Sequence, residues 1–386
     1  MEKIVYLKAR EILDSRGDPT VEVELQTEKS HVISSVPSGK SVGSHEAVEL
    51  RDNDSSRYDG MGVLKAVESV NSQISPVLLN QDASSQRQID DLLIQLDQTT
   101  HKSKLGANAI LGVSMAVCKA ASNSAGIPLY TYIARLSGNS IIKIPIPMFK
   151  MFDGAKHAGN KLEIQEYMVI FSQSEFRENY RLASELLHRI KIILRDKGLG
   201  TGVGDEGGFA PMLENDKEAL DLISSLGDLK IALDMAGVVP QNLPIEEIVN
   251  KYPVVSIEDP AGEDDFFNWA DLTQKYGSKI MLVGDDIFAT SVERLKKGFE
   301  LRLANSVLVK PNQIGTVSET IEFVNLARKN NYKIVVSHRS GETEDTFISD
   351  FSVGVGADFI KFGATCRGER VCKYNRLLRI EEKLNG

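Results

Sequence analysis

The stretch VVSIEDP, residues 254 to 260, decides the fold because it carries acidic side chains at the end of a buried strand. Its β-branched residues predict a short strand with little exposed surface, and Pro260 ends that strand. Glu258 and Asp259 then stand side by side at its carboxyl end. A buried carboxylate is costly unless a neighbouring charge offsets its own, so the rest of the chain must supply a partner for Glu258.

Runs of the same kind recur through the second part of the chain, and each ends in a polar or charged residue. The runs are LKIALD (229–234), VVSIED (254–259), IMLVGD (280–285), NSVLVK (305–310), KIVVSH (333–338) and ADFIK (357–361). Their polar ends are spaced 23 to 28 residues apart, and this length of a strand–helix unit predicts a parallel sheet with crossover helices. With the upstream runs IPIPMF (144–149) and EYMVIF (166–171), the pattern favours a (β/α)8 barrel over an open doubly wound sheet.

Three of these strand ends carry carboxylates. Because the carboxyl ends of barrel strands meet at one mouth, Asp234, Glu258 and Asp285 are expected to lie together. Taken singly, each acid could instead cap a helix or bond a loop. Three carboxylates in one pocket repel one another unless a hard divalent cation neutralises them, and oxygen ligands of this kind suit Mg²⁺. The pattern therefore favours a magnesium site.

The next strand ends have the opposite charge: they carry Lys310, His338 with Arg339, and Lys361. Cations that face a triple carboxylate fit a doubly anionic substrate between metal and protein, or a lysine that acts as a base. The loop GVGDEGG (202–208) adds two further acids, although a Gly-rich turn is a weak signal. The residues alone predict a metal-dependent enzyme that acts on a small acidic substrate by proton transfer.

Bulk properties exclude several classes of function. A chain of 386 residues suggests two domains or a large barrel with an appendage. The formal net charge of -9 argues against nonspecific binding to nucleic acid or to an anionic membrane. The cysteines, Cys118, Cys366 and Cys372, lack zinc-ligand spacing and fit reduced thiols. No apolar stretch has the length of a signal peptide or a membrane span, so we expect a cytoplasmic enzyme.

The first part of the chain has a different pattern. TVEVEL (20–25) alternates as a half-buried strand does, and VPSGKSVGSHEA (36–47) is a polar loop. LGANAILGVSMAVCKAA (105–121) predicts a helix that is buried on most of its circumference. A stretch rich in Pro and Gly follows it. We therefore expect an N-terminal α+β domain over residues 1–126 and a catalytic barrel over residues 140–386.

Long and unusual strings show that the chain resembles the enolase family from end to end. Among them are KLGANAILGVSMAVCKA, HAGNKLEIQEYM, VGDEGGFAP, VKPNQIGT and VSHRSGETEDTFISD. The resemblance implies an enolase-type variant (β/α)8 barrel preceded by a small α+β domain with a mobile active-site loop. It also implies a hydro-lyase that converts 2-phosphoglycerate to phosphoenolpyruvate, as in glycolysis, and a homodimer or larger homo-oligomer.

The resemblance also implies roles for individual residues. Lys310 matches the base that removes the C2 proton of the substrate. Glu206 matches the acid that protonates the departing C3 hydroxyl, with Glu166 and His157 nearby. This division of labour is the known pattern of the family, carried over to the matching positions.

Metal and substrate ligands follow in the same way. Asp234, Glu258 and Asp285 match the ligands of the first Mg²⁺, and Ser41 in the closing loop would contribute to a second Mg²⁺ that arrives with substrate. Lys361 matches the residue that holds the substrate carboxylate. The other residues expected to contact the substrate are Gln165, His338, Arg339 and Ser340.

The chain departs from the family pattern around this site. The closing loop, usually SGAST, has Lys40 in place of Ala and Val42 in place of Thr. The loop that usually reads N-x-x-N-G-G-x-H-A is here KMFDGAKHA (150–158), which contributes Lys150 and Lys156. These lysines are expected to add positive charge where an anion enters, and Lys40 is a candidate substrate ligand. In addition, Phe362 replaces a Thr, and the segment between Asp234 and Glu258 is short for the family.

Three interpretations follow. The first is an enolase, and the second is an enolase-like enzyme that dehydrates a related compound, such as a phosphonate with an extra carboxylate in phosphonate biosynthesis. The third is a binding protein without catalysis on the same scaffold. The acid, base and metal positions are all filled with the expected chemistry, which disfavours the third interpretation. The first two stay open.

Overall fold

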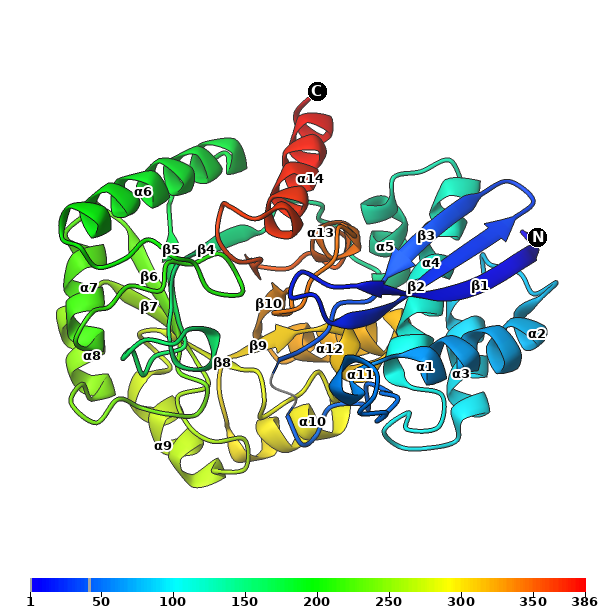
Figure 1. The fold of residues 1–386 in the computed structure, drawn as a ribbon, viewed down its shortest axis with the longest axis horizontal. Helices are drawn as coiled ribbons and strands as arrows, with labels where there is room; N and C mark the ends of the chain where they lie inside the picture. Colours follow the sequence, from blue (N-terminus) through cyan, green and yellow to red (C-terminus); the bar gives the residue numbers. More distant parts are fainter. Residues whose placement is uncertain (1, 41–42) are drawn as a thin grey trace.

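The chain opens with a three-stranded antiparallel sheet in the computed structural model, which describes residues 2–40 and 43–386 (Figure 1). The strands are β1 (Ile4–Leu13), β2 (Pro19–Thr27) and β3 (His31–Ser35). Along β2, Val21, Val23 and Leu25 are buried, whereas the acidic residues between them are partly exposed. This alternation confirms the strand expected for TVEVEL, which packs one face on a core.

Helices cover one face of this sheet. The Ala-rich run forms α4 (Ala107–Ser124), which is buried on nearly all sides as expected. Gly112 allows α4 to approach the sheet closely, because a Cβ at this position would lie 2.7 Å from a methyl carbon of Val23. The other helical segments are η1 (Tyr58–Gly60), α1 (Leu64–Glu68), η2 (Ser69–Ile74), α2 (Ser75–Leu78) and α3 (Gln86–Asp97).

The second part of the chain is a closed barrel with the strand order β10–β11–β4–β5–β6–β7–β8–β9. The predicted strands are all present, and apolar side chains such as Met148, Ala232 and Leu308 fill the interior. Helices surround the strands on the outside (Figure 1). The strands are β4 (Ile146–Asp153), β5 (Glu166–Ile170), β6 (Lys230–Asp234), β7 (Val254–Glu258), β8 (Met281–Gly284), β9 (Ser306–Val309), β10 (Lys333–Ser337) and β11 (Phe359–Lys361).

The variant (β/α)8 barrel preceded by a small α+β domain is confirmed, but the parallel sheet expected from the strand spacing is wrong at one strand. β5 runs antiparallel to both of its neighbours, β4 and β6, while the other pairs are parallel. The connection between β4 and β5 contains no crossover helix long enough to return the chain to the opposite edge, so the chain turns back at once. The reversal places the first residue of β5, Glu166, at the mouth, where it pairs with Asp153 on one side and Asp234 on the other.

The outer helices complete the barrel. They are α6 (Phe176–Asp196), α7 (Asp216–Ser224), α8 (Ile245–Lys251), α9 (Phe266–Tyr276), α10 (Val292–Leu301), α11 (Pro311–Ile314), α12 (Val317–Lys329), α13 (Phe347–Gly354) and α14 (Gly368–Asn385), with the short η3 (Ala155–His157) at the mouth. Both α6 and α7 lie between β5 and β6, so this connection contains a helix pair in place of one helix.

The helix α5 (Leu129–Ser137) joins the two parts and packs against α13. Tyr130 and Ile133 of α5 belong to the hydrophobic core around the barrel, whereas the core of the first part draws on residues up to Ala120. No single helix within the described ranges is long and apolar enough to cross a membrane; α4 and α5 pass that test only as a pair bent by 109°. The exact domain boundaries stay a prediction.

The start of α12 gives a prediction about stability. The Thr316 hydroxyl accepts a hydrogen bond from the Glu319 backbone N–H at 3.1 Å and donates one to the Glu319 carboxylate at 2.6 Å. Thr316→Ala removes both bonds, so we expect a loss of about 0.5–2 kcal/mol in the free energy of unfolding, measured with urea. Lys329→Ala at the exposed end of the same helix is the control. Equal stability of the two variants would contradict the prediction.

Candidate active site

The predicted site residues gather around one small polar cavity of about 40 Å³ at the mouth of the barrel. Glu258 lies beneath its floor with 4% of its surface exposed, and Ser41 lies outside the described residues. The roles of all these residues stay predictions. Those that line the cavity are Lys40, His157, Gln165, Glu166, Glu206, Asp234, Asp285, Lys310, His338, Arg339, Ser340 and Lys361.

Lys361 is the partner that the chain itself supplies for Glu258. Its ammonium lies 2.7 and 2.8 Å from the two Glu258 carboxylate oxygens and 3.2 Å from Asp234 Oδ2. Glu166 Oε1 lies 3.5 Å away. Burial opposes the charge on Lys361, but the surrounding carboxylates outweigh it and raise the pKa of Lys361 well above its ordinary value. Burial and the Asp234 charge raise the pKa of Glu258.

Lys310 and Asp285 form the second ion pair of the mouth. The Lys310 ammonium contacts Asp285 Oδ2, and the Gln313 amide donates to Asp285 Oδ1 at 2.9 Å. Burial lowers the pKa of Lys310, but the Asp285 carboxylate reverses this effect, so the pKa lies above its ordinary value. Lys310 is therefore held as a cation by Asp285 in this arrangement.

The donor set at this edge fits a hard cation. Asp234, Glu258 and Asp285 offer buried carboxylates at neighbouring strand ends, and Gln165 Oε1 is buried without a hydrogen-bond partner among the described residues. The three carboxylates do not converge as closely as expected, because Lys361 lies between two of them. A tighter set is formed by Asp285 with Asp259 and Asp286, whose oxygens lie within 4.8 Å of one another. Oxygen donors of this kind suit Mg²⁺.

Asp259, next to Glu258 in sequence, orients the loop that carries Asp285. Its carboxylate accepts hydrogen bonds from the backbone N–H groups of Asp285 and Asp286 at 2.9 and 3.0 Å. Burial, followed by the Asp285 charge, raises the pKa of Asp286 to about 7. Neither Asp259 nor Asp286 was singled out from the sequence as a site residue; the doublets ED and DD that end these two strands were the available signal.

The opposite side of the cavity holds Glu166, Glu206 and His157. Lys150 lies behind them, and its ammonium contacts Glu166 Oε1 at 3.1 Å and the Glu206 carboxylate. The expectation that Lys150 adds charge at the entrance is wrong, because its side chain is fully buried and does not reach the cavity. Lys156, by contrast, does line it.

Arg339 links the site to the first part of the chain. Its guanidinium donates to Glu46 at 2.8 and 3.2 Å and to Asn312 at 2.9 Å. Gly39 lies directly beside it, and a Cβ on Gly39 would lie 2.0 Å from Arg339 Nη2, so any larger residue there would displace the guanidinium. Arg370, which the sequence did not single out, is fully buried and donates to the backbone carbonyls of Arg339 and Ser340 at 2.7 and 2.6 Å.

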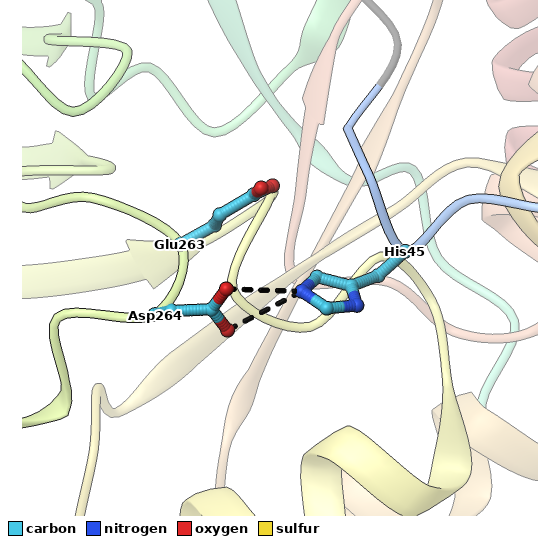
Figure 2. Close-up of side chains that lie close together, drawn as sticks. All are labelled: His45, Glu263 and Asp264. Carbon is cyan, nitrogen blue, oxygen red and sulfur yellow. Dashed lines mark hydrogen bonds and ion pairs between the residues drawn. The ribbon is translucent and has the colours of Figure 1, made fainter.

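The closing loop contacts the barrel on both sides of its undescribed residues. On one side, the Lys40 ammonium lies 2.7 Å from Asp205 Oδ2 in the Gly-rich loop. On the other, Ser44 donates to Glu263 at 2.7 Å, and a ring nitrogen of His45 lies 3.3 Å from the nearer oxygen of Asp264 (Figure 2). The loop is therefore anchored to two different barrel loops above the cavity.

Comparison with known protein families covers nearly the whole chain. The family model described as "Enolase, N-terminal domain" matches residues 4–133. The model described as "Enolase, C-terminal TIM barrel domain" matches residues 141–239 and 241–386.

The floor of the cavity gives a prediction about metal binding. Glu258→Gln replaces a carboxylate by a neutral amide of the same size, so we expect the affinity for Mg²⁺ to fall roughly tenfold or more. Calorimetric titration of the metal measures this, with Glu185→Gln on the exposed face of α6 as the control. Unchanged affinity in the Glu258 variant would remove this residue from the ligand set.

Proposed function

Since the chain belongs to the enolase family, we propose that it dehydrates 2-phosphoglycerate to phosphoenolpyruvate in a Mg²⁺-dependent reaction. The observation that carries this proposal is the division of the cavity into two sides. Lys310 follows β9, and Glu166 begins β5, four places away in the closed order. The proposed acid, Glu206, contacts the same Lys150 ammonium as Glu166, so Lys310 and this acidic pair lie on opposite sides of the mouth. A base and an acid placed in this way suit removal of a proton from one carbon and of a hydroxyl from the next.

The residues of the chain would act as follows. Lys310 takes the C2 proton, and Glu206 gives a proton to the C3 hydroxyl, which leaves as water. Lys361 and Arg339 hold the carboxylate and phosphate of the substrate, and they fix its orientation in a site largely closed to solvent.

Asp234, Glu258 and Asp285 would hold the metal. When bound, Mg²⁺ supplies the positive charge that stabilises the second negative charge on the substrate carboxylate as C2 loses its proton. The ion pair of Lys310 with Asp285 supports this proposal, because a cation held by Asp285 leaves Lys310 free to act as a base. A coupled assay of the purified protein with Mg²⁺ and 2-phosphoglycerate tests the activity directly.

Proton NMR in heavy water separates the two steps. Lys310→Ala should stop exchange of the C2 proton with solvent, because the base is gone. Glu206→Gln should still permit that exchange while elimination falls by on the order of 10²–10⁴-fold, because the acid is gone. If the Lys310 variant continued to exchange the C2 proton, the base would have to be assigned elsewhere.

A second candidate substrate is a carboxylated analogue of 2-phosphoglycerate, such as a phosphonate with an extra carboxylate. Lys40 favours this candidate, because its side chain lines the cavity and stands where the family usually has Ala. Lys156 also lines the cavity and adds to the positive charge there.

Substrate preference therefore gives a further prediction. If Lys40 contacts the extra carboxylate, Lys40→Ala should raise the ratio of kcat/KM on 2-phosphoglycerate to kcat/KM on the analogue, by the equivalent of about 1–3 kcal/mol. Asp205→Asn is the matched control, because it breaks the loop contact of Lys40 and leaves its charge in place. A ratio that changes equally in both variants, or in neither, would show that Lys40 only anchors the loop.

A further inference from the structure

Arg370 is a buried arginine at the start of α14 whose two terminal nitrogens are fully engaged. Nη1 donates to the Arg339 carbonyl at 2.7 Å and lies 2.7 Å from His338 Nδ1. Nη2 donates to the carbonyls of Ser340 and Asp205 at 2.6 and 3.1 Å. Two terminal nitrogens carry four N–H groups. Each of these groups therefore has one neighbour, and the guanidinium is held in a single orientation.

The neighbours of Arg370 come from two segments that contribute to the cavity. Arg339 and Ser340 are expected to bind the phosphate of the substrate, and Asp205 directly precedes the proposed acid, Glu206. A guanidinium is planar and rigid, so the carbonyls that it binds keep a fixed separation. Arg370 thus sets the position of the acid loop relative to the phosphate-binding segment.

The contact with Arg370 also determines where His338 carries its proton. Arginine stays protonated and has only donors, so His338 Nδ1 must accept this hydrogen bond with its lone pair. The single proton of the imidazole then lies on Nε2. Burial lowers the pKa of His338 well below its ordinary value, which agrees with a neutral ring. His338 is therefore a neutral side chain with a donor at Nε2.

The Nε2 atom of His338 lies next to the proposed acid. It is 3.0 Å from Glu206 Oε2, and both residues are buried and line the cavity. Nε2 completes no hydrogen bond with a residue that the structure describes. Because the contact with Glu206 alone would not hold the ring in one tautomer, the bond from Arg370 to Nδ1 has to do so.

We propose that Arg370 is a positioning residue that keeps His338 in the Nε2–H tautomer beside Glu206 and fixes the acid relative to the phosphate-binding residues. This proposal rests on the dehydration proposed above. In this tautomer neither ring nitrogen can accept a proton, so His338 leaves the proton of Glu206 to the departing hydroxyl. In the other tautomer a bare Nε2 would face Glu206 and compete for that proton.

Nitrogen-15 NMR of labelled histidine tests the tautomer without substrate. The chain has six histidines, and His338→Gln assigns the signal. In the wild type we expect His338 Nδ1 without a proton and Nε2 with one. Arg370→Met removes every donor but keeps a long side chain, so Nδ1 should gain a proton. A wild type with a proton on Nδ1, or an Arg370→Met variant with the wild-type pattern, would overturn the proposal.

The rates of the two reaction steps test the effect on the acid. We expect the ratio of elimination to C2-proton exchange to fall on the order of 10²-fold in Arg370→Met, because the acid is displaced and His338 competes for its proton. Exchange should change far less, since its base, Lys310, follows a strand on the opposite side of the mouth. An equal loss of both rates would refute the positioning role.

Arg376→Met is the matched control, because it removes an arginine from the same helix. Arg376 donates to both oxygens of Asp350, at 2.7 and 2.6 Å, and is not among the described residues that line the cavity. The His338 signal and the ratio should stay as in the wild type. A control that behaves like Arg370→Met would refute a specific role of Arg370.

A second variant covers the case in which Arg370→Met does not fold, as judged by thermal unfolding. Arg370→Lys keeps the charge but has three donors for four neighbours. We expect Nδ1 of His338 to gain a proton in part and the ratio to fall about tenfold, because a flexible ammonium does not hold the carbonyls as a rigid guanidinium does. Wild-type values of both measurements in this variant would count against the proposal.

The NMR measurement separates this proposal from the proposed function. If the wild type does not turn over 2-phosphoglycerate, the proposed function fails, and the tautomer of His338 alone then decides whether Arg370 positions this ring. If turnover is normal but Nδ1 of His338 carries a proton in the wild type, the dehydration stands and the role of Arg370 fails.

Discussion

At the mouth of this barrel, the negative charges of buried carboxylates must be balanced by nearby cations. Asp234 and Glu258 end adjacent strands, and they are stable there because Lys361 brings an ammonium between them. Lys310 does the same for Asp285, and Lys150 does so for the acids on the opposite side. A buried ion pair is costly to break from one side only, since it leaves an uncompensated charge. The positions of these lysines therefore depend on those of the acids. The cavity keeps its shape because each buried ammonium and carboxylate neutralises the charge of its partner.

Much of this arrangement could be predicted from the sequence, and the exceptions have physical causes. The spacing of strand-end residues predicted the barrel and placed Asp234, Glu258 and Asp285 at one edge, because strand direction and period follow from local pattern. The direction of β5 was missed because it depends on the length and shape of its connection to β4, and the residues of the strand itself do not encode it. Likewise, Lys150 was predicted to lie at the entrance because the segment that carries it flanks the pocket, but lysine can be buried when it is paired. Its partners become neighbours only when the barrel closes.

The first part of the chain takes part in the site. Glu46 holds Arg339, and the backbone N–H of Lys40 donates to Ser340 at 2.9 Å, so both contacts cross from the N-terminal sheet region to the barrel. The backbone of Ser38 exchanges two hydrogen bonds with Gly341, at 2.7 and 2.9 Å. These contacts lie on the same side of the cavity as the residues expected to bind phosphate. These hydrogen bonds therefore link the closing loop to the residues expected to bind phosphate.

The reversal of β5 also determines how the acid side is built. Because β5 runs away from the mouth, α6 starts at the far end of the barrel and runs back, and the connection between α6 and α7 returns to the catalytic edge with Glu206. Phe209 in this connection exchanges backbone hydrogen bonds with Met151 and Asp153 of β4, at 2.8 and 2.9 Å. A regular strand–helix unit would leave this connection on the opposite, structural face. One inverted strand thus adds a loop over the cavity that is tied by backbone hydrogen bonds to the barrel strand beneath it.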